Sequence, residues 1–335
     1  MAASGIFNVS RDGFKYGRTR FAARSNRMAT APEITHDGDT VSVSSADNLG
    51  IRFLGIDTAE ISYDFPGKKG FLGLGNQSWE EFFTGPELQK KMAGLSKSLA
   101  EYLWSKIGDG KDVAPNHFRH ASAARQRLLS EITNDMALCG KTNADFHFFL
   151  AYGFEFLDSY GRLLCYLRPH RDNFEGDVPE TANKDYNLRQ LENGTAVPYF
   201  IFPNVDPFLR IFNSLDKSII TPAGFWNIMA KASKLKAARQ AVKIAREQGK
   251  GIFDAADPLR ILPMELRSIS KGSKPNRYVI DLSQPGTDTL LDPELYFTIP
   301  NVEDRMYIPG NFGEYFQLAG WNLLRSETYT RLVRG

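Results

Sequence analysis

The sequence predicts an α+β protein, in which short strands and amphipathic helices are mixed along a chain of 335 residues. Apolar and polar residues alternate at 40–44, as in a half-buried strand, and a second strand is expected at 51–56. Leucine and methionine recur at helical spacing from about 85 to 106, and a strongly basic helix is expected at 231–248. With 42% hydrophobic and 24% charged residues, the chain can bury a core, which excludes a disordered chain, a collagen and a coiled coil.

The N-terminal half is expected to begin with an arm and then to enter the folded part. Residues 1–34 form the expected basic arm of low structure, because residues 11–27 carry six basic side chains against one acid. Such an arm is commonly a solvated tail, and contact with nucleic acid is the alternative. The glycine-rich residues 62–78 are expected to be a loop. The other elements expected here are a helix at 121–137 and strands at 146–150 and 163–167.

The C-terminal part is expected to follow the basic helix, which should end at the Gly-Lys-Gly sequence of residues 249–251. Residues 256–335 show no recognised family pattern and are interpreted as an extension subdomain with its own aromatic core. Its expected elements are strands at 265–269, 277–283, 294–299 and 305–308, and a terminal amphipathic helix.

Composition limits the class of protein further. Two cysteines exclude a disulfide scaffold and a cysteine-rich zinc module, and a net charge of +2 excludes a uniformly basic surface. No apolar run approaches the roughly 18 residues of a membrane span, so no membrane partner is expected. The N-terminus has no apolar signal segment, so the expected location is the cytoplasm.

Three short motifs carry side chains of the kinds that bind ions or take part in catalysis. The first, Asp-Gly-Asp-Thr at residues 37–40, enters a strand and taken alone is typical of a turn. The second, residues 52–60, gathers an arginine, a threonine and two carboxylates at the exit of an apolar strand, where a buried strand has no structural use for them. The third, Asp-Ser-Tyr-Gly-Arg at residues 158–162, precedes another apolar strand and taken alone is a hairpin turn.

Taken together, the motifs indicate a phosphodiester-hydrolysing site. Asp39, Asp57 and Glu60 supply hard oxygen ligands, which suit Ca²⁺ or Mg²⁺ better than zinc. Arg52 and Arg162 supply planar guanidinium groups that bind phosphate oxygens in pairs. Arg52 and Asp57 have opposite strand parity, so they can meet only if the chain bends near Ile56 or if Asp57 lies beyond the strand.

At these residues the chain resembles the staphylococcal nuclease (thermonuclease-like) family. The family pattern is Asp-Gly-Asp-Thr, then Arg-x-x-x-x-Asp-Thr-x-Glu, then Asp-x-Tyr-Gly-Arg, and all three stand here in that order. The resemblance covers residues 35–255, interrupted by insertions at about 108–143 and 168–186. It implies a five-stranded OB-type β-barrel with packed helices, to which a helical insertion and the C-terminal extension are added.

The resemblance also implies a role for each site residue. Asp39, Asp57 and the carbonyl of Thr58 would hold one Ca²⁺ ion, with Mg²⁺ or Mn²⁺ as the alternative. Glu60 would act as the base or position the attacking water. Arg52 and Arg162 would bind the scissile phosphate, and Tyr160 would lie near it. The family cleaves DNA and RNA with little sequence preference and leaves 3′-phosphates.

Some positions depart from the family pattern. Ala59 replaces the usual proline before Glu60, so the loop is expected to be less rigid. Phe200 and Phe202 stand where tyrosines often contact the nucleotide, so a hydroxyl contact is expected to be missing.

Three functional interpretations follow. The leading one is a metal-dependent nuclease that acts on DNA, RNA or both. The second is an OB-type module that binds nucleic acid or a partner without cutting it. The third is a nuclease restrained by a protein partner or by self-assembly, through the insertion or the C-terminal extension. The insertion carries six basic or histidine side chains within residues 111–127, so it is expected either to extend a nucleic-acid track or merely to cover the barrel.

Overall fold

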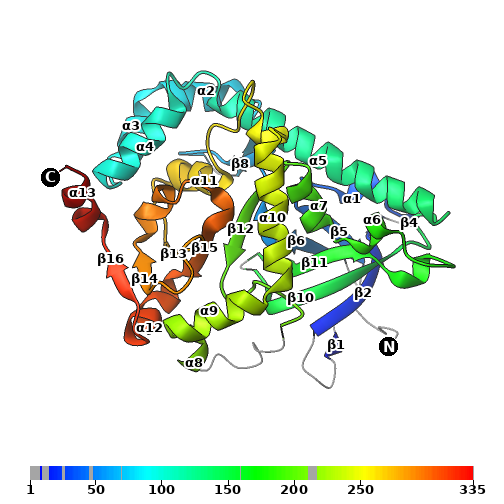
Figure 1. Cartoon of the computed structure of the whole chain (residues 1–335). Coiled ribbons are helices and arrows are strands. Elements are labelled where there is room, and N and C mark those ends of the chain that lie inside the picture. The colour runs from blue at the N-terminus through cyan, green and yellow to red at the C-terminus, as the bar shows by residue number, and fades with distance from the viewer. Residues whose placement is uncertain are drawn as a thin grey trace.

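A closed five-stranded β-barrel forms the N-terminal part of the computed structural model (Figure 1). The structure describes residues 8–9, 15–24, 27–44, 48–68, 70–158, 160–209 and 217–334. The barrel strands are neighbours in the order β2 (Lys15–Phe21), β10 (His147–Leu157), β11 (Leu163–Pro169), β6 (Asn48–Phe53) and β5 (Thr40–Ser44). The ring closes because β5 also pairs with β2, and β11 and β6 form its one parallel pair among the described strands. The predicted α+β fold with an OB-type barrel is thus confirmed.

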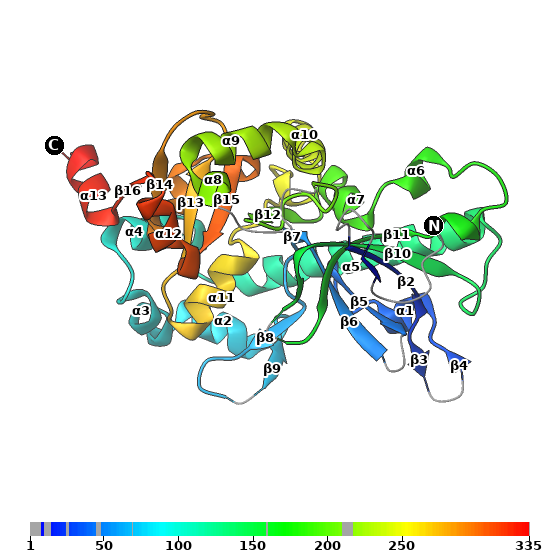
Figure 2. The same cartoon turned by 90° about the horizontal axis from the view of Figure 1, so that it is seen from below.

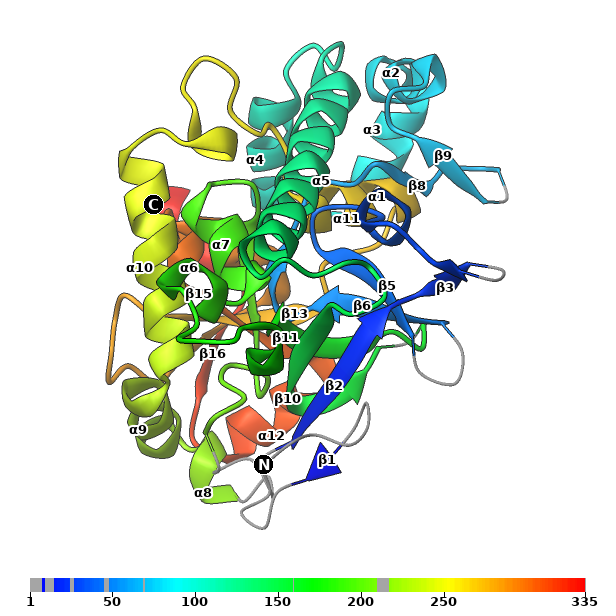
Figure 3. The ribbon, with the colours of Figure 1, turned by 90° about the vertical axis from the view of Figure 1, so that its right-hand side faces the viewer.

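The expectation of low structure in residues 1–34 is wrong for most of the described part. Strand β2 pairs with β10 from Arg20 opposite His147 to Tyr16 opposite Ala151, and Figure 3 shows it lying alongside β10. The basic side chains hid this strand, because Arg18 and Arg20 alternate with the buried Thr19 and Phe21. A strand with one solvated face carries its charges at every second residue. Arg11 lies outside the described residues. The other elements of this region are β1 (Asn8–Val9), β3 (Ala23–Arg24), β4 (Arg27–Met28) and α1 (Ala31–Ile34).

A second sheet joins strands of the C-terminal extension to two strands from the preceding part of the chain. Its strands are neighbours in the order β16 (Asn322–Leu324), β14 (Thr289–Leu291), β13 (Arg277–Asp281), β15 (Arg305–Pro309), β12 (Val197–Ile201) and β7 (Gly55–Asp57). Strand β12 connects the two parts of the chain, because it pairs with β7 on one side and with β15 on the other. Figure 2 shows this sheet beside the barrel, with β12 and β7 at the side nearest the barrel and α11 (Pro263–Lys271) and β8 (Ser62–Asp64) below the sheet in this view.

The long helix α5 (Val113–Leu138) contributes to two hydrophobic cores. Leu128 and Ile132 pack into the barrel core, and Val113 and Ala114 pack into the core shared with the extension. The helix begins earlier than the predicted residue 121. It lies in the predicted insertion at 108–143, so this insertion is part of both cores.

Several helices differ from the sequence expectation for local reasons. The expected helix from 85 to 106 is broken into α3 (Pro86–Met92) and α4 (Lys97–Ile107), because Gly94 intervenes and the Ser96 side chain caps α4. The expected loop at 62–78 contains the hairpin of β8 and β9 (Phe71–Gly73) and the start of α2 (Gln77–Thr84). The basic helix is present as α10 (Ser233–Glu247).

Two expected strands of the extension are helical. The segment 265–269 lies in α11, which begins at Pro263, and the N-cap residue Leu262, Leu266 and Ile269 are buried at helical spacing. The segment 294–299 falls in the 3₁₀ helix η4 (Pro293–Thr298), apart from its last residue. The expected terminal helix is divided into α12 (Gly313–Leu318), β16 and α13 (Ser326–Arg334).

The remaining elements are short helices that connect the two sheets or cover them. The α-helices are α6 (Glu180–Asn183), α7 (Tyr186–Glu192), α8 (Lys217–Ile220) and α9 (Pro222–Lys231). The 3₁₀ helices are η1 (Arg171–Asn173), η3 (Gly251–Phe253), η5 (Val302–Asp304) and η6 (Gly310–Phe312).

Candidate active site

A bend between β6 and β7 brings Arg52 and Asp57 together. Gly55 has φ of +76°, a conformation that L side chains rarely adopt, and it turns the chain out of the barrel sheet to pair with β12. Arg52 Nη2 then lies 2.5 Å from Asp57 Oδ1. The parity conflict seen in the sequence is resolved by this bend, which lies one residue earlier than Ile56.

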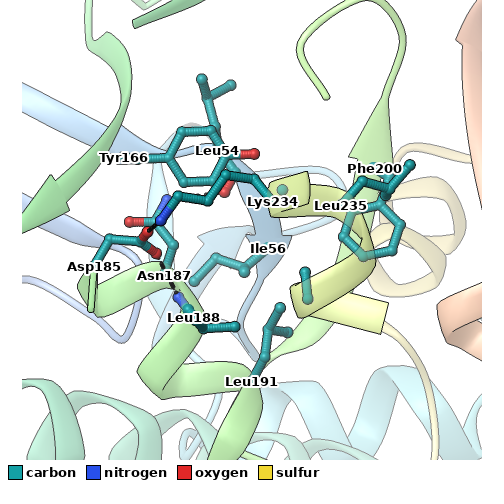
Figure 4. A pocket seen from close by; sticks show the side chains of 12 residues that line it. Leu54, Ile56, Tyr166, Asp185, Asn187, Leu188, Leu191, Phe200, Lys234 and Leu235 are labelled. Carbon is teal, nitrogen blue, oxygen red and sulfur yellow. Dashed lines mark hydrogen bonds and ion pairs between the residues drawn. The ribbon is translucent and has the colours of Figure 1, made fainter. Parts of the chain in front are cut away.

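The bend is held from behind by helix α7. Asn187 Nδ2 donates to the carbonyl of Leu54 at 2.8 Å and to that of Cys165 at 3.2 Å. An ion pair of 2.6 Å between Lys234 and Asp185 ties α10 to α7 beside it (Figure 4). The cavity in Figure 4 measures about 10 Å³, which is room for about one water molecule, so the side chains behind the bend are closely packed.

Asp39 is fully buried and accepts hydrogen bonds from three directions. Its Oδ2 accepts from the Thr58 N–H at 3.1 Å and pairs with Arg52, and its Oδ1 accepts from the Thr40 hydroxyl at 3.0 Å. Gly38 permits the close approach of this turn to α5, because a Cβ there would lie 2.5 Å from the Cβ of Ala124. The turn motif and the Arg-Asp-Thr motif therefore meet as the sequence suggested.

Arg267 of helix α11 completes this cluster from the C-terminal extension. Its Nη2 lies 2.5 Å from Asp57 Oδ2, and its Nη1 lies 3.0 Å from Asp57 Oδ1 and 2.7 Å from Glu60 Oε1. Two arginines, Arg52 and Arg267, thus share the carboxylate of Asp57. The sequence analysis missed Arg267 because its segment was expected to be a strand. The helical spacing of the apolar residues Leu262, Leu266 and Ile269, together with Pro263 at the first turn, is the signal that could have revealed its helix.

Burial and these charges set the protonation of the carboxylates. Burial favours the neutral acid at Asp57, but the charges of Arg267 and Arg52 outweigh it, and the pKa of Asp57 is lowered. At Glu60 burial dominates and the pKa is raised despite Arg267. Burial and the neighbouring Asp39 and Glu60 raise the pKa of Asp37 well above its ordinary value. Asp57 is therefore the fixed anion, and Glu60 is the carboxylate better suited to exchange a proton.

In this arrangement the carboxylates expected to bind a metal ion are already engaged within the protein. Both carboxylate oxygens of Asp57 are paired with guanidinium groups, and those of Asp39 are taken by Arg52, Thr40 and Thr58. Within the described ranges, no group of three or more histidine, cysteine or acidic side chains is gathered as a metal site. A cation at Asp57 would have to displace Arg267.

Arg162 and Tyr160 reach the site from the turn between β10 and β11. The Asp158 carboxylate holds this turn, because it accepts from the backbone N–H groups of Tyr160 and Arg162, each at 2.9 Å, and from Arg162 Nε at 2.8 Å. Tyr160 is 68% exposed, and the Arg162 guanidinium lies 5.5 Å from the centre of its ring. The hairpin turn that the sequence indicated is thus present, and it also places the Tyr160 and Arg162 side chains at the cleft.

One cleft of about 770 Å³ is lined by residues of all three motifs, whereas Asp39, Asp57 and Thr58 are buried and do not line it. The barrel contributes Asp37, Arg52, Glu60, Asp158, Tyr160 and Arg162 to its lining. The opposite wall is formed by side chains from β8, β9, β12, α11 and β13, among them Tyr63, Phe71, Tyr199, Arg267, Lys271 and Arg277. Phe200 and Phe202 are buried in a hydrophobic core, and their neighbour Tyr199 lines the cleft in their place.

None of the described residues of the insertion at 108–143 lines this cleft. Arg119 pairs with Asp112 and Asp257, and Arg125 donates to the carbonyl of Thr35. His117 is fully buried, and burial lowers its pKa to about 3, so it is uncharged at neutral pH. These contacts favour the interpretation that the insertion covers the barrel over the one in which it extends a nucleic-acid track.

Comparison with known proteins gives one partial similarity. No family model matches the chain. Over 131 residues, 39% of its length, the chain is 30% identical to Endonuclease YhcR of Bacillus subtilis (strain 168). The matched segment spans 8% of that endonuclease. Among the described residues, no helix has both the length and the apolar character needed to cross a bilayer, and the cytoplasmic location stays a prediction. The barrel and the partial similarity agree with a nuclease-like protein, and the thermonuclease family itself stays a resemblance.

Proposed function

We propose that the cleft hydrolyses phosphodiester bonds of DNA, RNA or both, with little sequence specificity. The observation that carries the proposal is the arrangement of Arg52, which is fixed between two buried carboxylates and lines the same cleft as Arg162. Guanidinium groups bind phosphate oxygens in a planar, directed manner, and a preorganised pair stabilises the charge that develops at phosphorus. The partial similarity to an endonuclease supports the same reaction class.

Each site residue has a proposed role. Arg52 and Arg162 bind the scissile phosphate, and the exposed ring of Tyr160 contacts the nucleotide. Glu60 accepts a proton from the attacking water or positions that water. Its raised pKa supports this role, because a general base works best when its pKa lies closer to the working pH. Asp39 and Asp57 orient Arg52 through their ion pairs.

We propose Ca²⁺ as the activating ion, with Mg²⁺ or Mn²⁺ as the alternative, held by Asp39, Asp57 and the Thr58 carbonyl. When bound, such an ion would neutralise charge on the phosphate. Because Arg267 already occupies both oxygens of Asp57, the ion would bind only in competition with that guanidinium.

The test is a cleavage assay of the full chain on single- and double-stranded DNA and RNA. Each substrate is incubated with Ca²⁺, with Mg²⁺, with Mn²⁺ and with excess chelator. We expect cleavage that requires a divalent cation and is fastest in Ca²⁺. Cleavage that persists undiminished in chelator would contradict the proposed metal dependence and leave the proposed nuclease activity in place.

The Arg162→Lys variant tests the site itself. Lysine keeps the charge and loses the planar fork, so turnover should fall by at least tenfold while the thermal unfolding transition is unchanged. Arg168→Lys is the matched control, because Arg168 lies on strand β11, which directly follows Arg162, and does not line the cleft. Equal losses in both variants would contradict the assignment.

The second candidate is a module that binds nucleic acid without cutting it. The observation that favours it is the engagement of both Asp57 and Glu60 by Arg267, which leaves neither carboxylate free in this arrangement. Binding of nucleic acid with no cleavage under any of the metal conditions would select this function.

A further inference from the structure

The C-terminal extension forms a basic groove that is continuous with the cleft. This groove measures about 450 Å³ and shares Tyr63, Tyr199, Arg267, Lys271 and Arg277 with the cleft. Beyond these residues, its lining consists of Met264, Ser268, Ser273, Lys274, Pro275 and Asn276. Four of the lining side chains are cationic and none is a carboxylate. A surface of this composition attracts a polyanion.

Two of the four cations are not neutralised by the protein. Within the part of the chain that the structure describes, neither Lys271 nor Arg277 forms an ion pair with a carboxylate. Lys271 lies 5.5 Å above the ring of Tyr63, and Arg277 donates from Nη1 to the Tyr199 hydroxyl at 2.7 Å. The Nε of Arg277 is buried and has no hydrogen-bond partner. A buried donor without a partner is costly, so a ligand oxygen that accepts from it would be stabilising.

Aromatic side chains stand beside these cations. Phe71 is 64% exposed at the start of β9, Tyr160 is 68% exposed, and both line the cleft. Exposed rings of this size on a soluble surface are suited to stack against a flat ligand. The combination of cations and exposed rings is the one that binds unpaired nucleotides, because the phosphates meet the cations and each base offers a face to a ring.

We propose that the groove and the adjoining cleft together bind a single-stranded segment of the substrate, with its phosphates on Lys271 and Arg277 and unpaired bases on Phe71 and Tyr160. This inference rests on the proposed function and adds a substrate class to it. A duplex fits the arrangement less well, because its bases are stacked within the helix and cannot present their faces to Phe71 and Tyr160.

The test measures binding separately from hydrolysis. Fluorescence anisotropy follows a labelled, phosphorothioate-protected oligothymidylate and a duplex of the same length, with the full chain, over a range of salt concentrations. Each neutralised phosphate of a single strand contributes about 0.7 to the slope of log K against log salt, so Lys271→Ala combined with Arg277→Gln should lower the slope by roughly 1.4. Phe71→Ala should weaken single-strand binding between about fivefold and about 150-fold.

Lys243→Ala is the matched control for the charge that is lost. Lys243 lies on the basic helix α10, its side chain is 54% exposed, and it lines neither the cleft nor the groove. This variant should keep the parent's affinity and salt slope. Thermal unfolding of every variant should stay within a few degrees of the parent, and Phe71→Ala alone carries the test if the double variant does not fold.

Several outcomes would overturn the inference. They are a parent chain that binds no oligonucleotide, an unchanged affinity and slope in the groove variants, an equal loss for the duplex, and an equal loss in Lys243→Ala. Hydrolysis of a small diester, bis(p-nitrophenyl) phosphate, separates this inference from the nuclease proposal. If the parent binds single strands through these residues and hydrolyses neither nucleic acid nor the small diester, the binding groove is retained and the nuclease proposal is rejected.

Discussion

The two walls of the cleft hold their charges in different ways. The barrel wall carries Arg52 and Arg162, and the extension wall carries Arg267, Lys271 and Arg277. On the barrel wall, Arg52 and Arg162 are each paired with carboxylates of neighbouring barrel residues, so their guanidinium groups are fixed before any ligand arrives. On the extension wall, Lys271 and Arg277 contact tyrosines instead of carboxylates. Arg267 belongs to the extension wall and yet pairs with the barrel carboxylates across the cleft.

This difference separates two tasks that both use cations. A guanidinium held by buried carboxylates keeps its orientation, which is what the stabilisation of a reacting phosphate requires. A cation without a carboxylate partner keeps more of its attraction for an anion, which is what the binding of a long polyanion requires. The barrel wall is therefore suited to chemistry, and the extension wall is suited to holding the substrate.

The largest expected effect is on the barrel wall. Glu60→Gln should lower the rate of nucleic-acid cleavage by about 10²- to 10⁴-fold, because a general base would be lost while the shape of the side chain is kept. Glu155→Gln is the control, since Glu155 also lines the cleft but accepts a hydrogen bond from Asn204. A rate near that of the parent in Glu60→Gln would show that Glu60 takes no part in the reaction.

The second prediction compares the stability of the two walls. Arg52→Gln leaves the buried Asp39 without its ion-pair partner, so the free energy of unfolding should fall by about 3–5 kcal/mol in denaturant titration. Arg277→Gln removes one hydrogen bond to a tyrosine and should cost about 1 kcal/mol. If the two losses are equal, the barrel wall is not held by its ion pairs in the way described.

The third prediction concerns the arginine that crosses the cleft. Arg267→Gln removes the guanidinium that competes for Asp57, and a hydrogen bond to a charged group contributes about 1.5–3 kcal/mol. Calorimetric titration should therefore show Ca²⁺ affinity rising by about 10- to 150-fold. Lys274→Gln, in the adjoining groove and paired with Glu294, should leave the affinity unchanged. An unchanged affinity in Arg267→Gln would mean that no metal competes for Asp57.

The smallest effect is expected in the insertion, away from both walls. Arg119→Gln breaks an ion pair with Asp112 and one with Asp257, and the free energy of unfolding should change by about 1 kcal/mol or less. Affinity for nucleic acid and its salt slope should match those of the parent. A clear fall in the slope would restore the hypothesis that the insertion contacts phosphate.

Local patterns in the sequence were sufficient for most of the barrel wall. The alternation at 40–44 and the apolar runs around 150 and 165 predicted strands that are present as β5, β10 and β11. The three motifs predicted residues that the structure brings to one cleft. These predictions succeeded because strand periodicity and turn residues act over a few positions of the chain. The same reasoning failed for β2, where alternating charges looked like a disordered arm, and for α11, where a short apolar run fits either a helix or a strand.

The sequence by itself predicted four of the five barrel strands, a bend near Ile56 and the presence of carboxylates and arginines in motifs that suit phosphate chemistry. Only the tertiary structure decided what neutralises those carboxylates. Arg267 lies 207 residues from Glu60 along the chain and reaches it because β12 pairs with both β7 and β15 and so brings the extension beside the barrel. Local patterns cannot predict such a contact, because it depends on the path of the whole chain. The pairing of Asp57 with Arg267, and with it the competition expected for a metal ion, follows from that path.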